Sequence, residues 1–212
     1  MAYYNGKKVL SRFYNGKKVL SFVYYNVLPS TFQQVEYIES TGTQYINTGV
    51  SGECSWEVKL QFKQIETKTQ IIMGRSDNAG YWFGALPSRS GGYYGFGNDN
   101  ASSILATSLA VAKINTHNDA ISGTVNEQTI PTRYTVSTTI SYRYHLFNAP
   151  TDFNYPSYAK LYSCKTYVNN ILVRDFVPCY RKSDNVIGLY DLVNDVFYTN
   201  AGSGTFIKGG NV

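Results

Sequence analysis

The sequence is short of the residues from which hydrolytic sites are usually built. Only 16% of its 212 residues are charged, and it has just two histidines. No Glu-x-Asp or Asp-x-Glu occurs, so no single strand offers the two carboxylates that glycoside hydrolysis requires on one face. Asp77 and Asp99 remain as a pair from separate loops, although acidic loop residues usually serve turns. A glycoside hydrolase or depolymerase is therefore the alternative to a protein without enzymatic activity.

Neither histidine lies in a context that indicates catalysis. His145 lies in a strand-like segment, and His117 is followed by Asn118 and Asp119, which predict a turn. The glycine-rich stretch 91–97 lacks the strand and helix that flank a phosphate-binding loop. We therefore expect a protein that is not an enzyme and assign it no catalytic residue.

Cysteine is scarce as well. Cys54, Cys164 and Cys179 are an odd number without the close spacing of metal ligands, so they indicate neither a disulfide framework nor a zinc site. We expect them to be reduced and buried, and we expect no cofactor and no metal. No apolar run approaches the roughly 18 residues that cross a bilayer, and the first residues lack the apolar core of a signal peptide. These absences predict that the protein does not insert into a membrane. They also predict that it is synthesised in a cytoplasm.

Aromatic residues and glycine are abundant instead. There are 20 tyrosines, 11 phenylalanines and 18 glycines, and aromatic residues favour the half-buried surface of a β-strand. Apolar and polar residues alternate over 56–62, and more weakly over 134–140, which predicts strands with one solvated face. Residues 169–170 and 193–195 predict hairpin turns, whereas 104–113 is the one plausible helix. The chain is therefore predicted to be all-β, folded as a sandwich, jelly roll or barrel.

The first 27 residues differ from the rest in pattern and charge. The octapeptide YNGKKVLS occupies residues 4–11 and recurs unchanged at 14–21, and its Asn-Gly pairs predict type I′ turns between short strands. The net charge of +5 belongs to this arm, because the remaining 14 basic side chains face 14 acidic ones. A basic arm on a neutral body predicts docking to an acidic surface, and solvated lysines beside turns are the alternative.

Apolar residues occur on both faces of the predicted arm strands, and exposed strand edges tend to pair with another chain. We therefore assign residues 1–27 an attachment role, with packing of the arm on its own domain as the alternative. The residues expected to carry the attachment are Tyr4, Lys7, Lys8, Tyr14, Lys17 and Lys18.

The main domain, residues 28–212, opens with LPSTFQQVEYIESTGTQYINTGV and closes with AKLYSCKTYVNNILVRDFVPCYRKSDNVIGLYDLVNDVFYTNAGSGTF, at 28–50 and 159–206. These blocks resemble the concanavalin A-like or laminin-G-like domains, lectin-like jelly rolls found in tail, fibre and other virion proteins of phages and prophages. The resemblance covers nearly all of residues 28–209, although the middle matches only in strand rhythm. It implies a two-sheet antiparallel jelly-roll sandwich whose first and last segments lie side by side.

The resemblance also implies a function. It points to a non-enzymatic structural protein of the virion, in a tail, a fibre or a capsid decoration, assembled in the cytoplasm of the bacterial host. Its partners would be other virion proteins, reached through the arm, and a cell-surface or mucosal glycan. Resemblance to phage fibres favours a homo-oligomer, with a trimer as the expected state. No specific nucleic acid is expected as a partner.

A ligand site is expected in the aromatic, glycine-rich middle of the domain, because loops on a rigid sandwich can vary their contacts without disturbing the core. Aromatic rings cover the apolar face of a sugar, and Asn and Asp satisfy its hydroxyl groups. The alternative is that these aromatic residues fill the core. The residues expected to bind a ligand are Trp82, Tyr93, Tyr94, Asn98 and Asp99.

Overall fold

The computed structural model describes residues 27–63, 68–75, 81–86, 92–96, 100–134, 143–149, 155 and 157–212, together with the backbone of 2–4, 7–14 and 17–23. Every regular element among these residues is a β-strand, so the all-β prediction is confirmed. The predicted strand over 134–140 lies mostly outside the described residues. Within the described part of the chain there is no helix of the length and apolarity needed to cross a membrane.

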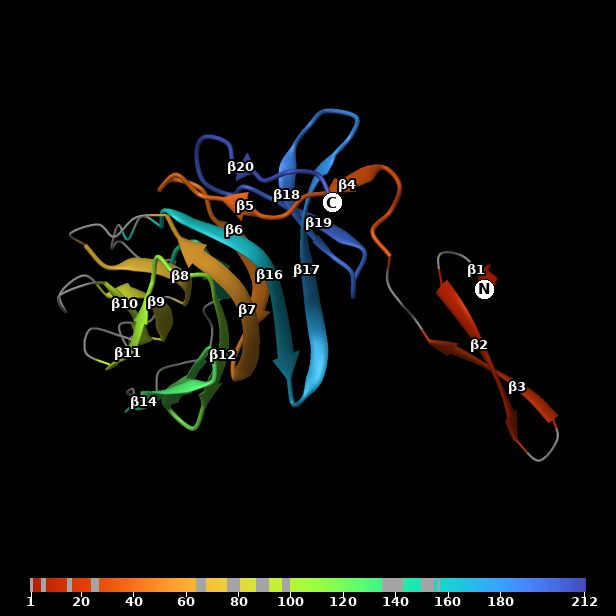
Figure 1. Cartoon of the computed structure of the whole chain (residues 1–212), viewed down its shortest axis with the longest axis horizontal. Coiled ribbons are helices and arrows are strands. Elements are labelled where there is room, and N and C mark those ends of the chain that lie inside the picture. The colour runs from red at the N-terminus through yellow and green to blue at the C-terminus, as the bar shows by residue number, and fades with distance from the viewer. Residues whose placement is uncertain are drawn as a thin grey trace.

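The N-terminal arm forms a sheet of its own (Figure 1). Its strands are β1 (Ala2–Tyr4), β2 (Lys7–Tyr14) and β3 (Lys17–Val23), and they pair antiparallel in the order in which they follow one another. Tyr4 pairs with Lys7 and Tyr14 with Lys17, so only two residues join each pair of strands. The predicted meander is confirmed, whereas the turn residues and the arm side chains lie outside the described residues.

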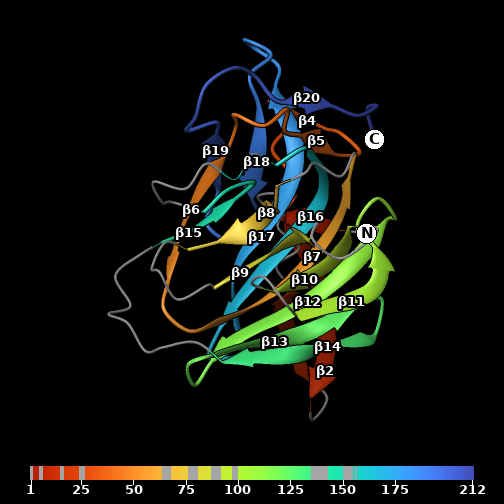
Figure 2. The ribbon, with the colours of Figure 1, turned by 90° about the vertical axis from the view of Figure 1, so that its left-hand side faces the viewer.

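One sheet of the body has six strands (Figure 2). Its neighbouring strands are antiparallel. In spatial order the strands are β11 (Asn100–Leu105), β10 (Tyr93–Phe96), β9 (Trp82–Leu86), β8 (Gln70–Gly74), β15 (Arg143–Leu146) and β6 (Ile46–Ser51). Every residue of β8 and β9 is buried, which places these two strands between covering layers on both faces.

The second sheet is larger and also antiparallel. Its main path runs through β14 (Gln128–Tyr134), β13 (Ala120–Val125), β12 (Ala110–His117), β7 (Cys54–Phe62), β16 (Ala159–Val168), β17 (Ile171–Arg181), β18 (Ile187–Asp191) and β19 (Val196–Thr199). Three short strands extend it: β4 (Phe32–Gln34) pairs with β17, and β5 (Ile38–Glu39) pairs with β16 and with β20 (Ile207–Lys208).

The two sheets share one hydrophobic core. Trp56 of β7 packs edge-on against Tyr144 of β15, with ring centroids 5.3 Å apart, and Phe62 of β7 lies 5.9 Å from Tyr94 of β10. Alternate residues of β7 are buried, as the pattern over 56–62 predicts. Two antiparallel sheets that bury facing side chains in a common core are consistent with a β-sandwich.

The predicted helix over 104–113 is wrong. This stretch holds the end of β11, a turn and the start of β12. From Ala110 onward alternate side chains are buried in the core while Val111 and Lys113 are exposed. The period of two is the signature of a strand with one solvated face, and in this sheet tertiary packing outweighs the helical propensity of the alanines.

The first and last segments of the domain lie side by side, as expected. The β5–β20 pairing and an isolated bridge between Val35 and Asn211 join them. The expected hairpin turns are also present: Asn169 and Asn170 have φ of 50° and 61° between β16 and β17, and Asp195 has φ of 56° between β18 and β19. Asn and Asp are the residues other than glycine that tolerate this left-handed conformation best.

Candidate functional site

The aromatic residues expected to bind a ligand instead belong to the interior. Tyr94 is fully buried, its ring stacks on Phe83 with centroids 5.8 Å apart, and its hydroxyl donates to the Ser108 carbonyl at 2.8 Å. Burial raises the pKa of this phenol. The prediction is wrong at Tyr94, because packing of β10 against the second sheet recruits the ring into the core.

The other residues of that prediction do not form a surface site either. Trp82 is 8% exposed and packs with Ile71 and Leu86 in a small cluster on the outer face of the six-stranded sheet. Tyr93 is half-buried, while Asn98 and Asp99 lie outside the described residues. The structure therefore brings together no ligand site from Trp82, Tyr93 and Tyr94, and the alternative that aromatic residues fill the interior fits Trp82 and Tyr94.

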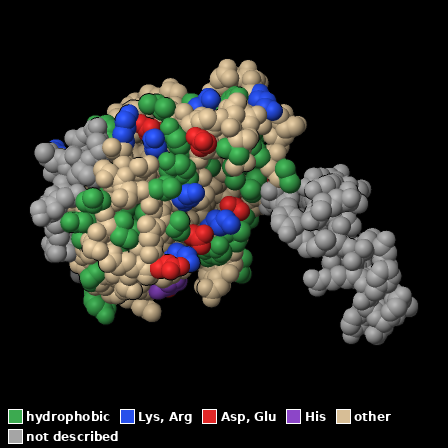
Figure 3. Space-filling view, in the orientation of Figure 1, with side chains coloured by type: hydrophobic (Ala, Val, Ile, Leu, Met, Phe, Trp, Pro, Cys, Tyr) green, Lys and Arg blue, Asp and Glu red, His purple; other side chains and the backbone are tan. Residues whose placement is uncertain are grey.

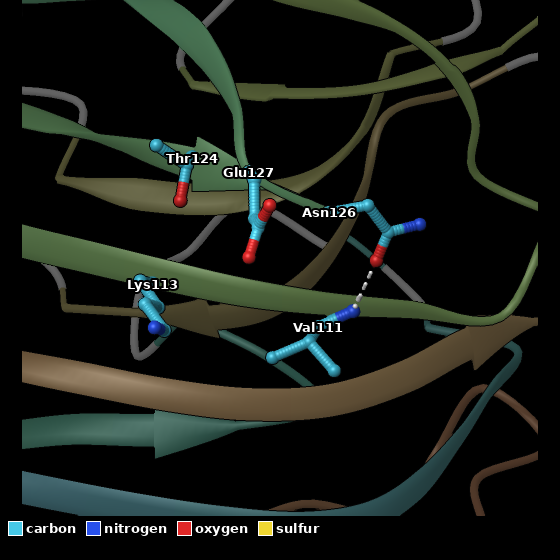
Figure 4. A pocket seen from close by; sticks show the side chains of 5 residues that line it. All are labelled: Val111, Lys113, Thr124, Asn126 and Glu127. Atoms are coloured by element: carbon cyan, nitrogen blue, oxygen red, sulfur yellow. Dashed lines mark hydrogen bonds between the residues drawn. The ribbon is translucent and has the colours of Figure 1, made fainter.

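A hollow on the larger sheet is a better candidate. It has a volume of about 530 Å³ and lies over the paired strands β12 and β13, beside the turn that joins β13 to β14 (Figure 4). Figure 4 shows side chains reaching toward it from both strands and from the turn that follows β13. The residues that line it are Val111, Lys113, Thr124, Asn126 and Glu127. We call this hollow the hairpin groove.

The strand pattern explains why these side chains meet. Ala112 and Val125 pair across the hairpin and are buried, so their neighbours Val111 and Thr124 face the opposite side of the sheet. Lys113 pairs directly with Thr124. The alternation over Ala110–His117 was the signal that could have identified these residues, but the helical interpretation of 104–113 concealed it.

Asn126 builds the groove and is not free to bind in it. Its side-chain oxygen accepts the Val111 N–H at 2.9 Å, and its own N–H donates to the Val111 carbonyl at 2.9 Å. With Asn126 at φ of 46° and Glu127 at 67°, the turn has the left-handed backbone of a two-residue hairpin loop. Within the described residues, no side-chain hydrogen bond or ion pair engages Lys113, Thr124 or Glu127.

Charges of both signs alternate across the solvated face that carries the groove. Lys113 pairs with Glu57 on the next strand, Glu57 with Lys165, and Lys165 with Asp175. The last two side chains approach to 4.0 Å, and burial raises the pKa of the Asp175 carboxyl. Figure 3 shows this mixture of basic and acidic side chains on the face. This balance of basic and acidic side chains suits a polar ligand of little net charge better than a polyanion.

The three cysteines are free and buried, as predicted. Burial raises the pKa of Cys54 to about 11 and of Cys179 to about 12, and it also raises the pKa of Cys164. Because the thiolate is the reactive form, these side chains behave as small apolar residues of the core.

His145 has the surroundings of a structural residue. It is 8% exposed, its ring stacks on Tyr45 with centroids 4.8 Å apart, and burial lowers its pKa to about 4. The buried Nδ1 has no hydrogen-bond partner among the described residues. The imidazole is therefore neutral at pH 7 and packs as part of the interior.

Within the described residues, no three His, Cys, Asp or Glu side chains gather in a way that could hold a metal ion. In comparisons with known proteins, neither the protein-family models nor the curated proteins gave a match to this chain.

Proposed function

We propose that this chain is a structural protein of a phage virion, in which the basic arm attaches a displayed lectin-like domain to other virion proteins. One observation carries the proposal. The arm strands β1, β2 and β3 pair only with one another among the described residues, whereas residues 28–212 supply both sheets of the body and the core between them. An arm that contributes no strand to its own body is available for attachment to another component.

The proposed architecture of the body is a concanavalin A-like jelly roll. The pairing of β5 with β20 and of Val35 with Asn211 supports it, because the resemblance implies that the first and last segments lie together. Tail, fibre and capsid decoration are equally compatible locations.

The distribution of charge supports the direction of attachment. All five basic residues before residue 27 lack an acidic counterpart in the arm, while the body is neutral as a whole. Summed charge of this kind steers association with an acidic partner surface. We propose that self-association of the arm strands into a trimer accompanies attachment, because unpaired strand edges favour pairing between chains.

The proposed ligand of the displayed domain is a neutral host-surface or mucosal glycan, and the proposed site is the hairpin groove. Lys113, Thr124 and Glu127 offer hydrogen-bonding groups to sugar hydroxyls, and Val111 offers an apolar contact. No aromatic ring is among the described residues that line the groove, so binding relies on hydrogen bonds and is expected to be weak.

The experiment that tests attachment compares two variants with the full chain in purified virions. Deletion of residues 1–26 should leave the thermal unfolding of the body unchanged and abolish incorporation. Replacement of Lys7, Lys8, Lys17 and Lys18 by Gln should weaken incorporation while keeping the strands. The matched control replaces four body lysines, Lys59, Lys113, Lys160 and Lys165, and should incorporate normally. Absence of the full chain from virions, or normal incorporation of the deletion variant, would overturn the proposal.

A further inference from the structure

Three side chains at one end of the larger sheet form a hydrogen-bonded series. His117, the last residue of β12, has Nε2 3.4 Å from Ser55 Oγ and Nδ1 3.3 Å from Glu53 Oε2. Glu53 also accepts the Asn118 N–H at 2.8 Å through its other oxygen. These bonds give the imidazole a hydroxyl on one nitrogen and a carboxylate on the other. His117 therefore ends a strand, and the turn predicted for it begins one residue later.

Strand pairing explains why the three groups meet. Thr116 pairs with Cys54, and both are buried, so the residues on either side of them face solvent. Asn115 pairs with Ser55, which places these two side chains next to each other on the solvated face. The register of β7 and β12, with Glu53 directly before β7, therefore fixes the series, and no long loop is needed to bring it together.

We propose that Ser55 is a nucleophile toward small acyl esters, with His117 as its general base and Glu53 as the residue that positions the imidazole. Hydroxyl, imidazole and carboxylate in this order constitute the arrangement that activates a serine for acyl transfer. The inference goes beyond attachment and display and does not depend on them. It revises the expectation that neither histidine serves catalysis.

The proposed reaction consumes only the ester and water. The Ser55 oxygen adds to the ester carbonyl while its proton passes to His117 Nε2. The bond to the alcohol oxygen then breaks, and the imidazolium returns the proton to the departing alkoxide, which leaves acyl-Ser55. Water repeats the two steps, giving its proton to His117 during attack, and the Ser55 oxygen leaves and is reprotonated. The products are one alcohol and one carboxylic acid.

Two neighbouring groups fit the supporting roles. The Asn115 side chain lies on the strand opposite Ser55, within the roughly 5 Å that separates directly paired Cβ atoms. Its amide is assigned to stabilise the oxyanion, a task that side-chain amides perform in other acyl-transfer sites. At the other end, the bonds from Asn118 and His117 lower the pKa of Glu53. The carboxylate is therefore ionised at neutral pH and able to orient the imidazole.

The exposure of the His117 and Glu53 side chains limits the class of substrate. The His117 side chain is 38% exposed and that of Glu53 51%, so the site lies open on the sheet. It offers little surface to bind a large ligand, and water competes for its hydrogen bonds. We assign it accessible small acyl groups such as acetyl esters, with general-base assistance of about a hundredfold, the lower end of the usual range.

The test uses the full chain and p-nitrophenyl acetate. Peptide mass spectrometry of protein quenched during turnover should find an acetyl group on Ser55. Ser55→Ala should lower the rate at least tenfold and abolish the adduct at this position. The matched control is Ser122→Ala, since Ser122 pairs with Asn115 on the other side and has no imidazole partner among the described residues; it should keep the wild-type rate.

Further variants separate the proposal from simple surface reactivity. His117→Gln should abolish the Ser55 adduct in a protein with unchanged thermal unfolding. Glu53→Gln should lower kcat while leaving KM and thermal unfolding nearly unchanged, because the imidazole loses the carboxylate that orients it. An unchanged rate for Ser55→Ala, with no acetyl-Ser55 in the wild type, would show that His117 acts alone and would overturn the proposal.

Discussion

The two sheets of the body differ in how many of their faces meet solvent. In the smaller sheet every residue of β8 and β9 is buried, because the core covers one face and the cluster around Trp82 covers the other. In the larger sheet the buried residues of β7 and β12 alternate with half-buried or exposed ones. The smaller sheet therefore uses its aromatic residues for packing, and the larger sheet has side chains free for contacts with other molecules.

The largest effect on stability is expected from a substitution in the buried, smaller sheet. Tyr94→Ala should lower the free energy of unfolding by about 3 to 5 kcal/mol, because it removes a fully buried ring and leaves a cavity. Tyr94→Phe keeps the ring and removes only the hydroxyl, which donates to the Ser108 and Leu60 carbonyls, so it should cost about 1 kcal/mol. Denaturant unfolding measures both. A loss below 1 kcal/mol for Tyr94→Ala would show that β10 does not lie in the core.

Acid should destabilise the protein through His145. The folded pKa is about 4, whereas an unfolded histidine titrates near 6.5. Between these values the unfolded chain binds the extra proton, so stability falls as the pH is lowered from 6.5 to 4. We expect a loss of about 1 to 3 kcal/mol across this window. In His145→Phe that pH dependence should disappear; a variant with the same acid dependence as the wild type would place its cause elsewhere.

A smaller effect is expected at the turn that supports the hairpin groove. Asn126→Ala should cost about 1 to 2 kcal/mol, because alanine tolerates the left-handed backbone poorly and cannot bond the Val111 N–H. Asn126→Gly removes the backbone strain but does not restore the hydrogen bond to the Val111 N–H. It should therefore lower the free energy of unfolding by less than Asn126→Ala does. Thermal unfolding distinguishes them, and equal losses would mean that the backbone conformation contributes nothing.

The smallest effect on stability is expected in the groove itself. Lys113→Ala and Thr124→Val should change the free energy of unfolding by less than about 0.5 kcal/mol, because Lys113 is exposed and Thr124 is only half-buried on the solvated face. Both variants should nevertheless weaken binding to a glycan array or to host cells. Lys165→Ala, on the same face but paired with Asp175, is the control and should bind normally. Equal binding by all three variants would exclude the groove as the glycan site.

The alternation of apolar and polar residues allowed part of the fold to be predicted from the sequence. Over 56–62 one face is buried and the other is solvated, so the apolar pattern alone predicts both the strand and its inward residues. The smaller sheet gives no such signal, because residues buried on both faces produce continuous apolar runs. Tyr94 and Trp82 could therefore be assigned equally well to a core or to a binding site until their neighbours were known.

By itself the sequence determined the all-β class, the meander of the arm, the hairpin turns at 169–170 and 193–195, and the burial of the cysteines. Each depends on local conformational preference or on residue polarity, which short segments carry. Only the tertiary structure decided which strands pair, and pairing alone sets Ser55 beside His117 and Lys113 beside Thr124. Residues 62 positions apart in the chain meet there through the register of two strands, and no local pattern specifies that register.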